Sequence, residues 1–402
     1  MWGQSRKGGE ALDGIRVLDL SRVLAGPFCS MILGDLGAEV IKVEAPGGSD
    51  ETRRWGPPFK NGVSAYYLCA NRNKKSVTID LKSAKGKEII ERLVKNSDVV
   101  IHNFKTGTME RLGLSYEELS SINPGIIYCS ITGFGETGPY KTHPGYDFII
   151  QAMSGLMSIT GTDESGPQKV GVAMTDVLTG LYACIGIQSA LLERQQSGQG
   201  QKLDLSLYES AVSSLVNIAS NYLMSGNLPS RLGNHHANIV PYQTFRTSDG
   251  EMVIAVGNDR QFQALCTIIN KPDLAHNPKF KTNPDRVEHR EELTAILQTE
   301  LEKQHTSYWQ EQCHAHNIPV GPIQNMEEIR NDPQLNARNF FQSIKHPKAG
   351  EMDILGSPLH LSRTPPKVRS HPPEPGEHND EIFTSIGLSP SEIQEYKNNQ
   401  WI

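Results

Sequence analysis

One carboxylate stands apart at the start of a long helix-like segment. The segment reads VGVAMTDVLTGLYACIGIQSALLE, from Val170 to Glu193, and Asp176 is its only acid before Glu193. From residue types alone, the favoured interpretation is structural. Thr175 or Asp176 can accept hydrogen bonds from the free N–H groups at a helix start and so act as the N-cap.

The chemical interpretation of Asp176 uses the same position. N–H groups at a helix start and the helix macrodipole favour the ionised form, so an aspartate with a reference pKa of about 3.9 stays charged at neutral pH. A charged, partly desolvated carboxylate can attack an activated acyl group and form a covalent intermediate. A thioester suits this attack, because a mixed anhydride and a free thiolate are then not far apart in energy. Capping and catalysis both remain open at this point.

A second candidate is the segment GFGETG at residues 133–138, which matches G-x-G-x-x-G and follows a strand-like run. A dinucleotide fingerprint should also open a helix. The residues that follow, PYKTHPGYD, contain two prolines and have no apolar period. We therefore interpret the segment as a glycine-rich loop at the carboxyl end of a strand, where it can still line a site.

Other familiar catalytic patterns are missing from the sequence. It contains no P-loop, no H-E-x-x-H and no G-x-S-x-G. His235 and His236 are adjacent, so on an extended segment their side chains point in opposite directions. No acid or cysteine is spaced to join them. We expect a loop with one hydrogen-bonding histidine there rather than a metal site.

Basic residues gather in three loops that follow strand-like runs. Taken singly, each group is best explained as a solvated face. Taken together at one edge of a sheet, they could hold a polyphosphate. The groups are Arg53 with Arg54, then Arg72, Lys74 and Lys75, and finally Lys105 with Arg111 and Lys82.

The composition is that of a soluble globular protein. The 402 residues are 37% hydrophobic and 21% charged, and the net charge of -6 lacks the basic excess of a nucleic-acid binder. No run reaches the roughly 18 apolar residues of a membrane span, and the opening MWGQSRKGGE lacks the apolar core of a secretory signal. The six cysteines form no C-x-x-C pair and are expected to be reduced and mostly buried.

The elements that must position these residues alternate in the first half of the chain. Strand-like runs such as IRVLDL, EVIKVEA, SVTIDL, DVVIHNF and GIIYCSITGFG are separated by segments with helical spacing. This alternation predicts an α/β fold with a parallel, doubly wound sheet. Ligands of such sheets bind at the carboxyl ends of the strands.

Two domains are predicted. The chain turns helical over 176–224, with one interruption at SGQGQKLDLSL, and TFRTSDGEMVIAVGN then indicates a hairpin that turns at Asp249-Gly250. We place a smaller α+β domain at 225–330. The Pro-rich tail is expected to lie over the first domain, which gives a discontinuous large domain of residues 1–224 and 331–402.

Taken as an ordered set, the motifs resemble the class III CoA-transferases of the CaiB/BaiF type. This family also contains formyl-CoA:oxalate CoA-transferase and α-methylacyl-CoA racemase. The resemblance extends from LDGIRVLDLSRVLAGPFCSMILGDLGAEVIKVE (12–44) to GEHNDEIFTSIGLS (376–389) and includes NRNKKSVTIDLK, TGFGETGP, GYDFIIQAMSGLMSITG and GVAMTDVLTGLYA. It implies a Rossmann-like large domain that binds CoA, a smaller domain, and a homodimer whose subunits form interlocked rings.

The family's nucleophile is the aspartate of G-x-x-x-x-D-x-x-x-G, which falls on Asp176, with Gly180 as the last glycine. This resemblance reverses the preference drawn from residue types, and capping and catalysis are then expected together. The matches to the family's CoA contacts are Val23 and Leu24 near the thiol, Ile79 and Lys82 around the nucleotide, Asn103, Phe104, Arg111 and Leu112, and Tyr146 near the reacting centre.

Three departures from related members bear on ligands and reaction. Ala45 stands where the oxalate enzyme has an arginine, so a CoA contact is missing or moved, and the short NHHANIVPY loop (234–242) replaces that enzyme's glycine-rich lid. Tyr146 replaces the racemases' histidine base, and a tyrosine, with a reference pKa of about 10, is a poor base. Acyl transfer is therefore favoured over the alternatives of acyl-CoA racemisation and non-catalytic acyl-CoA binding.

The resemblance implies a substrate class as well. CoA is expected to move from succinyl-CoA to a dicarboxylate such as glutarate or 3-hydroxy-3-methylglutarate, through an aspartyl mixed anhydride and an aspartyl-CoA thioester. CoA thioesters are then substrates, and no metal, permanently bound cofactor, nucleic acid or membrane is expected. Arg22 or the 234–242 loop is the candidate for the acceptor's distal carboxylate, and N–H groups near Ala25 for the oxyanions. The implied compartment is the mitochondrial matrix, with the targeting segment absent from this chain.

Overall fold

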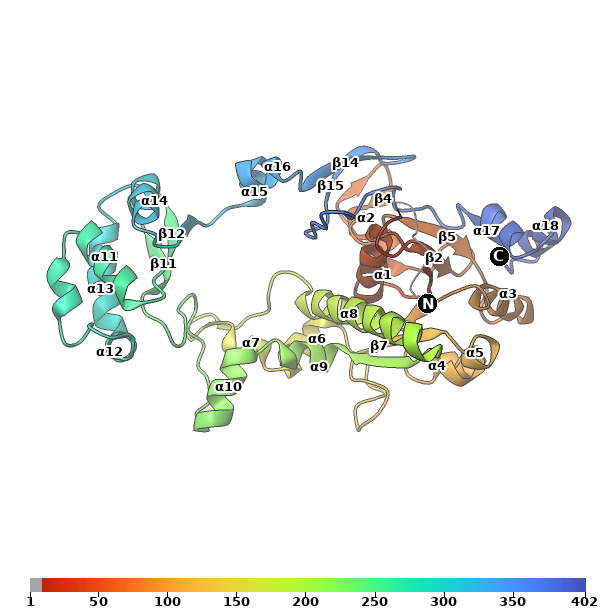
Figure 1. Ribbon diagram of the computed structural model, residues 1–402, viewed down its shortest axis with the longest axis horizontal. Coiled ribbons are helices and arrows are strands. Elements are labelled where there is room, and N and C mark those ends of the chain that lie inside the picture. The colour runs from red at the N-terminus through yellow and green to blue at the C-terminus, as the bar shows by residue number, and fades with distance from the viewer. Residues whose placement is uncertain (1–8) are drawn as a thin grey trace. The chain divides into compact units, whose positions relative to one another are not determined.

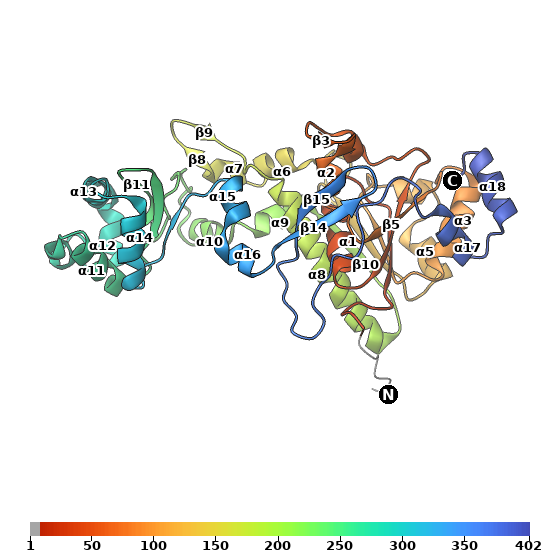
Figure 2. The same cartoon turned by 90° about the horizontal axis from the view of Figure 1, so that it is seen from above.

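The computed structural model describes residues 9–402, which form two compact units (Figures 1 and 2). Unit 1 takes in the described residues up to 156, residues 169–215 and residues 333–402, and unit 2 takes in 157–168 and 216–332. The first eight residues, which make up most of the opening MWGQSRKGGE, lie outside the described residues.

A six-stranded sheet organises unit 1, and every neighbouring pair of its strands is parallel. This confirms the predicted α/β class with a parallel sheet. In spatial order the strands are β10 (Lys202–Ser206), β7 (Ile127–Thr132), β6 (Val99–His102), β1 (Arg16–Asp19), β2 (Glu39–Glu44) and β5 (Lys74–Thr78).

The strand order reverses beside β1. The chain runs from β1 outward to β2 and β5, and then returns to build β6, β7 and β10 on the other side of β1. The loops after β1 and β6 therefore diverge at the carboxyl edge of the sheet. A doubly wound sheet binds its ligands at such a switch point.

Two apolar layers cover the sheet because alternate strand residues face opposite sides. Leu18, Ile41 and Val100 lie in one buried cluster with residues of α3, α5, α17 and α18. Val17 and Val40 lie in the other with residues of α1, α6, α8 and α9. The helices are α1 (Ala25–Asp35), α3 (Ala84–Val94), α5 (Tyr116–Ile122), α6 (Asp147–Met153), α8 (Met174–Ser197), α9 (Leu207–Ser213), α17 (Asn379–Ser385) and α18 (Pro390–Asn398).

The remaining elements of unit 1 are short. The tail packs on unit 1, where the His378 N–H donates to the Ser76 carbonyl oxygen at 2.9 Å. These elements are η1 (Glu51–Arg54), β3 (Phe59–Lys60), β4 (Val63–Ser64), α2 (Ala65–Leu68), α4 (Thr108–Arg111), α16 (Pro333–Ala337), β14 (Phe341–His346) and β15 (Gly350–Leu355).

Unit 2 has its own core around a three-stranded antiparallel sheet. The predicted hairpin with its turn at Asp249-Gly250 is confirmed as β11 and β12. The elements are β8 (Gly161–Thr162), β9 (Gly166–Pro167), α10 (Val216–Ser225), β11 (Tyr242–Arg246), β12 (Glu251–Ala255), α11 (Asp259–Ile268), η2 (Pro272–His276), α12 (Asn283–Glu288), α13 (Arg290–Leu301), α14 (Thr306–Ala315), β13 (Val320–Pro322) and α15 (Met326–Asn331), while α7 (Leu156–Ile159) begins in unit 1 and ends in unit 2.

Three features differ from the sequence-based expectations or refine them. The interruption SGQGQKLDLSL contains β10, an edge strand whose half-exposed polar residues gave it no continuous apolar run. The tail contains the hairpin β14–β15, which the sequence did not predict. By length and hydropathy α8 could cross a membrane, but it packs in the core between α1 and β7, with Ala183 and Ile187 fully buried.

The cysteines bear out the expectation of free thiols. All six are unpaired, and five of them are buried, whereas Cys69 is exposed.

Candidate active site

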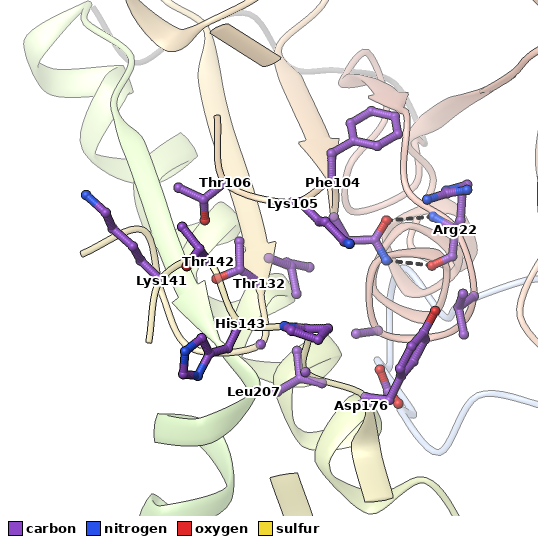
Figure 3. A pocket seen from close by; sticks show the side chains of 18 of the residues that line it. Arg22, Phe104, Lys105, Thr106, Thr132, Lys141, Thr142, His143, Asp176 and Leu207 are labelled. Carbon is purple, nitrogen blue, oxygen red and sulfur yellow. Dashed lines mark hydrogen bonds between the residues drawn. The ribbon is translucent and has the colours of Figure 1, made fainter. Parts of the chain in front are cut away.

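A pocket opens at the switch point of the sheet (Figure 3). It is lined by the loops after β1, β6 and β7 and by the start of α8. Asp176, Val23, Asn103, Phe104 and Tyr146 all line it. The structure therefore brings five residues that the sequence singled out, from four separate segments, to one place.

The carboxyl group of Asp176 lies in the first turn of α8 but does not cap it. The N-cap residue is Ala173, which has no side-chain acceptor, so the predicted N-cap role of Thr175 or Asp176 is wrong. Instead, the Asp176 carboxyl accepts a hydrogen bond from the backbone N–H of Ala25, at the start of α1. The predicted oxyanion donor near Ala25 is thus already engaged by the carboxylate itself.

Gly180 explains why Asp176 can reach another helix. A Cβ atom at Gly180 would lie 2.8 Å from the carbonyl oxygen of Ala25 and 3.2 Å from the Phe28 ring. Only a residue without a side chain permits this close approach of α8 to α1. Residues four apart share one helix face, so the spacing D-x-x-x-G places the glycine at the helix contact and the carboxylate one turn before it.

The protonation of Asp176 differs from the sequence-based expectation. Burial, followed by the negative charge of Asp147, raises the pKa of Asp176 to about 7, while the hydrogen bond from Ala25 acts in the opposite direction. The expectation of an ordinary, low pKa was therefore wrong. It considered the helix macrodipole alone, whereas desolvation and a second carboxylate outweigh that effect here.

The loop between β1 and α1 is held by buried charges. Val23 has a φ of +69°, which is rare for a β-branched residue. Its N–H donates to Asp50 Oδ1 at 3.2 Å, and Lys42 Nζ donates to both the Ser21 carbonyl oxygen (3.0 Å) and Asp50 Oδ2 (2.9 Å). Although burial opposes it, Lys42 holds the pKa of Asp50 at about 2. The buried Lys42–Asp50 pair thus holds the strained turn that precedes the Ala25 N–H.

Asn103, in the loop after β6, binds the peptide of Arg22 in the loop after β1. Figure 3 marks the two hydrogen bonds to Arg22 as dashed lines. Its side-chain oxygen accepts from the Arg22 N–H at 2.9 Å, and its amide donates to the Arg22 carbonyl oxygen at 2.6 Å. The Arg22 guanidinium itself is paired with Glu51 at 2.8 Å. Asn103 therefore joins the loops after β1 and β6 across the switch point.

A second depression lies at the start of α3 and is lined by Lys82, Lys87, Arg111 and Leu112. Phe104 in the first pocket and Leu112 in the second pack against the same apolar cluster. Leu24 and Ile79, the two remaining predicted CoA contacts, line neither the pocket nor the second depression. Leu24 is buried, and Ile79 is fully buried in the core.

The three basic loops do not meet as one polyphosphate site. Arg53 is bound to Glu44, Arg72 to Asp35, and Lys74 to Asp19, with each of these pairs largely or fully buried. Their charges are neutralised inside the fold, so this part of the prediction is wrong. Of the third group, Lys82 and Arg111 share the second depression, and Lys105 lines the first pocket.

The glycine-rich loop GFGETG does not open a helix, so the dinucleotide interpretation is excluded and the loop interpretation is confirmed. Gly133 lines the pocket. A Cβ atom there would lie 2.7 Å from the Cα of Gly145. This backbone contact carries the segment before Tyr146 over the end of β7.

In the 234–242 loop, His236 Nδ1 accepts a hydrogen bond from the Asn238 N–H at 3.0 Å.

Four residues of the site were missed by sequence reasoning. Lys141 and His143 line the pocket, and Figure 3 shows both across it from Asp176. Asp147 Oδ1 accepts a hydrogen bond from the Thr175 N–H, in the first turn of α8, at 2.8 Å. Burial and the nearby charge of Asp176 raise the pKa of Tyr66 to about 12. Asp147 stands in the GYD motif beside Tyr146 and could have been found there, but SAYYLCA gave no sign of Tyr66.

Comparisons with known proteins show the family of this chain. The profile described as CoA-transferase family III matches residues 12–379. Human succinyl-CoA:glutarate CoA-transferase is 44% identical over 375 residues, which cover 93% of this chain and 86% of that protein. The succinate–glutarate CoA-transferase of Agrobacterium fabrum is 44% identical over 381 residues, which cover 93% and 95%.

Solved structures show the same relationship. The crystal structure of a CaiB/BaiF family protein from Brucella suis has a TM-score of 0.83 and 44% identity, with 94% of this chain and all of that chain covered. A Mycobacterium tuberculosis protein has a TM-score of 0.84 at 31% identity, with coverage of 94% and 100%. The chain therefore belongs to CoA-transferase family III and is a CoA-transferase.

Proposed function

We propose that the enzyme moves CoA from succinyl-CoA to a dicarboxylate such as glutarate or 3-hydroxy-3-methylglutarate, with Asp176 as its nucleophile. The observation that carries this proposal is the Asp176 carboxyl in a pocket at the switch point, held by the Ala25 N–H. The donor and acceptor are supported by relatives named for succinyl-CoA and glutarate.

In this mechanism each step exchanges one bond for another. An Asp176 oxygen bonds the succinyl carbonyl carbon, the C–S bond breaks, and CoA leaves as a thiolate. The thiolate then attacks the aspartyl carbonyl carbon of the anhydride, which gives an aspartyl-CoA thioester and succinate. Glutarate attacks that thioester, and the two steps run in reverse. The Ala25 N–H, released when Asp176 loses its charge, becomes available to an oxyanion.

For CoA, we propose that its nucleotide lies near the second depression and its thiol near Val23. Lys82, Lys87 and Arg111 meet at that depression, and a cluster of cations suits a phosphorylated ligand. Val23 and Asn103 lie in the pocket that holds Asp176. Ile79 would act through the shape of the core, since its side chain is fully buried.

The acceptor's distal carboxylate needs a cation that is not already neutralised. Arg22 is paired with Glu51. In the described part of the chain, Lys105 and Lys141 line the pocket without a carboxylate within ion-pair distance. We therefore favour a lysine over Arg22. The test compares the preference for glutarate over butyrate in Lys141→Met, Lys105→Met and Arg22→Met. We expect one of the lysine variants to lose this preference. An unchanged preference in both lysine variants would leave Arg22 as the candidate.

A homodimer is part of the proposal. Apolar side chains of α6 and α8 are exposed in the single chain: Phe148 is 56% exposed, Ile185 60% and Leu192 61%. Exposed apolar surface of this kind suits a protein interface. Sedimentation or light scattering that finds a monomer at assay concentration would reject the homodimer.

The bacterial relative matches as well as the human one, so the mitochondrial matrix stays a prediction.

The test of the proposed function mixes the enzyme with succinyl-CoA and glutarate and follows glutaryl-CoA and succinate by mass. Product from the parent and none from Asp176→Ala supports the full proposal. If the parent and Asp176→Ala both form glutaryl-CoA, Asp176 is not the nucleophile. If the parent forms no glutaryl-CoA but transfers CoA to other acids, glutarate is not its acceptor. Racemisation is tested by exchange of the α-proton in deuterium oxide, which we expect to be absent.

A further inference from the structure

A carboxylate other than Asp176 organises the start of α8. Asp147 Oδ1 accepts two hydrogen bonds from Thr175, one from its N–H and one from its hydroxyl, both at 2.8 Å. Thr175 is fully buried and directly precedes Asp176. Because the N-cap residue Ala173 offers no side-chain acceptor, Asp147 serves as the acceptor for this helix start from another helix.

The second oxygen of Asp147 is fixed as well. Asp147 Oδ2 accepts from Gln151 Nε2 at 2.8 Å, and Gln151 Oε1 accepts from the Val170 N–H at 2.8 Å. Gln151 is fully buried. The carboxylate is therefore clamped between α6 and the segment leading into α8. Hydrogen-bond donors face both of its oxygens, which is the pattern of an ionised carboxylate.

We propose that Asp147 is a positioning residue for Asp176, which fixes the first turn of α8 and places a negative charge beside the nucleophile. This inference rests on the proposed function. When Asp176 bonds the acyl carbon, its negative charge leaves with the CoA thiolate as the C–S bond breaks. The repulsion between the two carboxylates is then relieved. Asp147 thus favours the acylated enzyme over the free carboxylate, without touching the substrate.

The charge environment of Asp176 supports this role. After burial, Asp147 is the group that raises the pKa of Asp176 to about 7. A more basic carboxylate is the better nucleophile once ionised. The other titratable groups around the nucleophile are Tyr66 of α2, Tyr146 before α6, and the pocket residues Arg22, Glu51, Lys105, Lys141 and His143.

The experiment measures kcat/KM for succinyl-CoA against pH in the parent and in Asp147→Asn. The asparagine keeps an oxygen for Thr175 but removes the charge. We expect the midpoint of the acid limb to move down by about one pH unit, and the plateau rate to fall, because the carboxylate is less basic. Thr175→Val removes one hydrogen bond and keeps the charge, so its plateau falls while its midpoint stays.

An unchanged midpoint in Asp147→Asn would overturn the inference and leave the transferase intact. If that variant does not fold, Asp147→Ser, which also keeps an acceptor oxygen without charge, must show the same shift. Asp380→Asn removes an exposed carboxylate of α17 and serves as the control for net charge. Transfer that persists in Asp176→Ala would instead reject the proposed function, so the two failures are distinguishable.

Discussion

The Cβ atom that Gly180 lacks would lie 2.8 Å from the carbonyl oxygen of Ala25. Residues with side chains do not approach a backbone this closely. The contact lets α8 meet the start of α1, where the Ala25 N–H binds Asp176. The glycine one turn after the aspartate is thus part of the arrangement that holds the carboxylate in the pocket.

Replacing Gly180 by alanine should separate α8 from α1 and withdraw the Ala25 N–H from Asp176. We expect kcat/KM for succinyl-CoA to fall by about tenfold to a hundredfold, the scale of a small misplacement of reacting groups. Gly186→Ala is the matched control in the same helix, because its new Cβ meets only the end of the Leu203 side chain. Equal activity in the two variants would contradict the role of this contact.

Asp176→Asn should stabilise the protein in alkaline but not in acidic solution. Burial raises the pKa of Asp176 from 3.8 to about 7, so between these pH values the folded protein holds a proton that the unfolded chain has released. The contribution of Asp176 to the parent's free energy of unfolding therefore falls as pH rises through this range, and the variant lacks this contribution. We expect a relative gain of about 2 to 4 kcal/mol at pH 8 compared with pH 4.

Urea unfolding at these two pH values measures that gain. A difference between variant and parent that is the same at both would show that Asp176 titrates normally. The comparison also separates stability from function, since the stabilised variant should have lost transfer activity.

Removing Lys42 should destabilise unit 1. Lys42 and Asp50 are a fully buried ion pair that holds the Ser21–Val23 turn. Lys42→Met leaves the Asp50 carboxylate buried without its cation, which costs about 3 to 5 kcal/mol. The control Lys303→Met removes an exposed lysine from Glu300, which keeps Lys271 as a partner at 3.5 Å, and we expect a change within about 0.5 kcal/mol. Similar denaturation midpoints for both variants would refute this.

Arg111→Ala should weaken CoA binding without slowing the chemistry. Arg111 lines the depression that also holds Lys82 and Lys87. Loss of a charged hydrogen bond to phosphate should raise KM for succinyl-CoA by about tenfold and leave kcat within about twofold. The exposed Arg260 supplies the control Arg260→Ala. We expect the control to leave KM unchanged, and a KM that is also unchanged in Arg111→Ala would place the nucleotide elsewhere.

The parallel sheet could be predicted because its central strands are continuous apolar runs between helical segments. Its edge strand β10 could not, because KLDLS alternates polar and apolar residues and is partly exposed on both faces. The hairpin β14–β15 was not predicted for the same reason, because most residues of its strands are half-buried or exposed. Strand existence at an edge depends on a partner strand that local patterns do not contain.

The site shows a similar division. Asp176 and its pocket neighbours lie in short motifs that a family resemblance locates, and the structure brings them together. The pKa of Asp176 depends on burial and on Asp147, 29 residues earlier in the chain. Likewise, Arg53, Arg72 and Lys74 looked like phosphate ligands until their buried acid partners were known. Charge compensation is a property of the fold and not of the motif.

The most direct test of Asp176 as the nucleophile is the mass of the enzyme mixed with succinyl-CoA alone and quenched in acid. The mechanism predicts a covalent succinyl or CoA adduct on the peptide that contains Asp176, which disappears when glutarate is added and never forms in Asp176→Ala. Transfer without any adduct on this peptide, or undiminished transfer by Asp176→Ala, would contradict it.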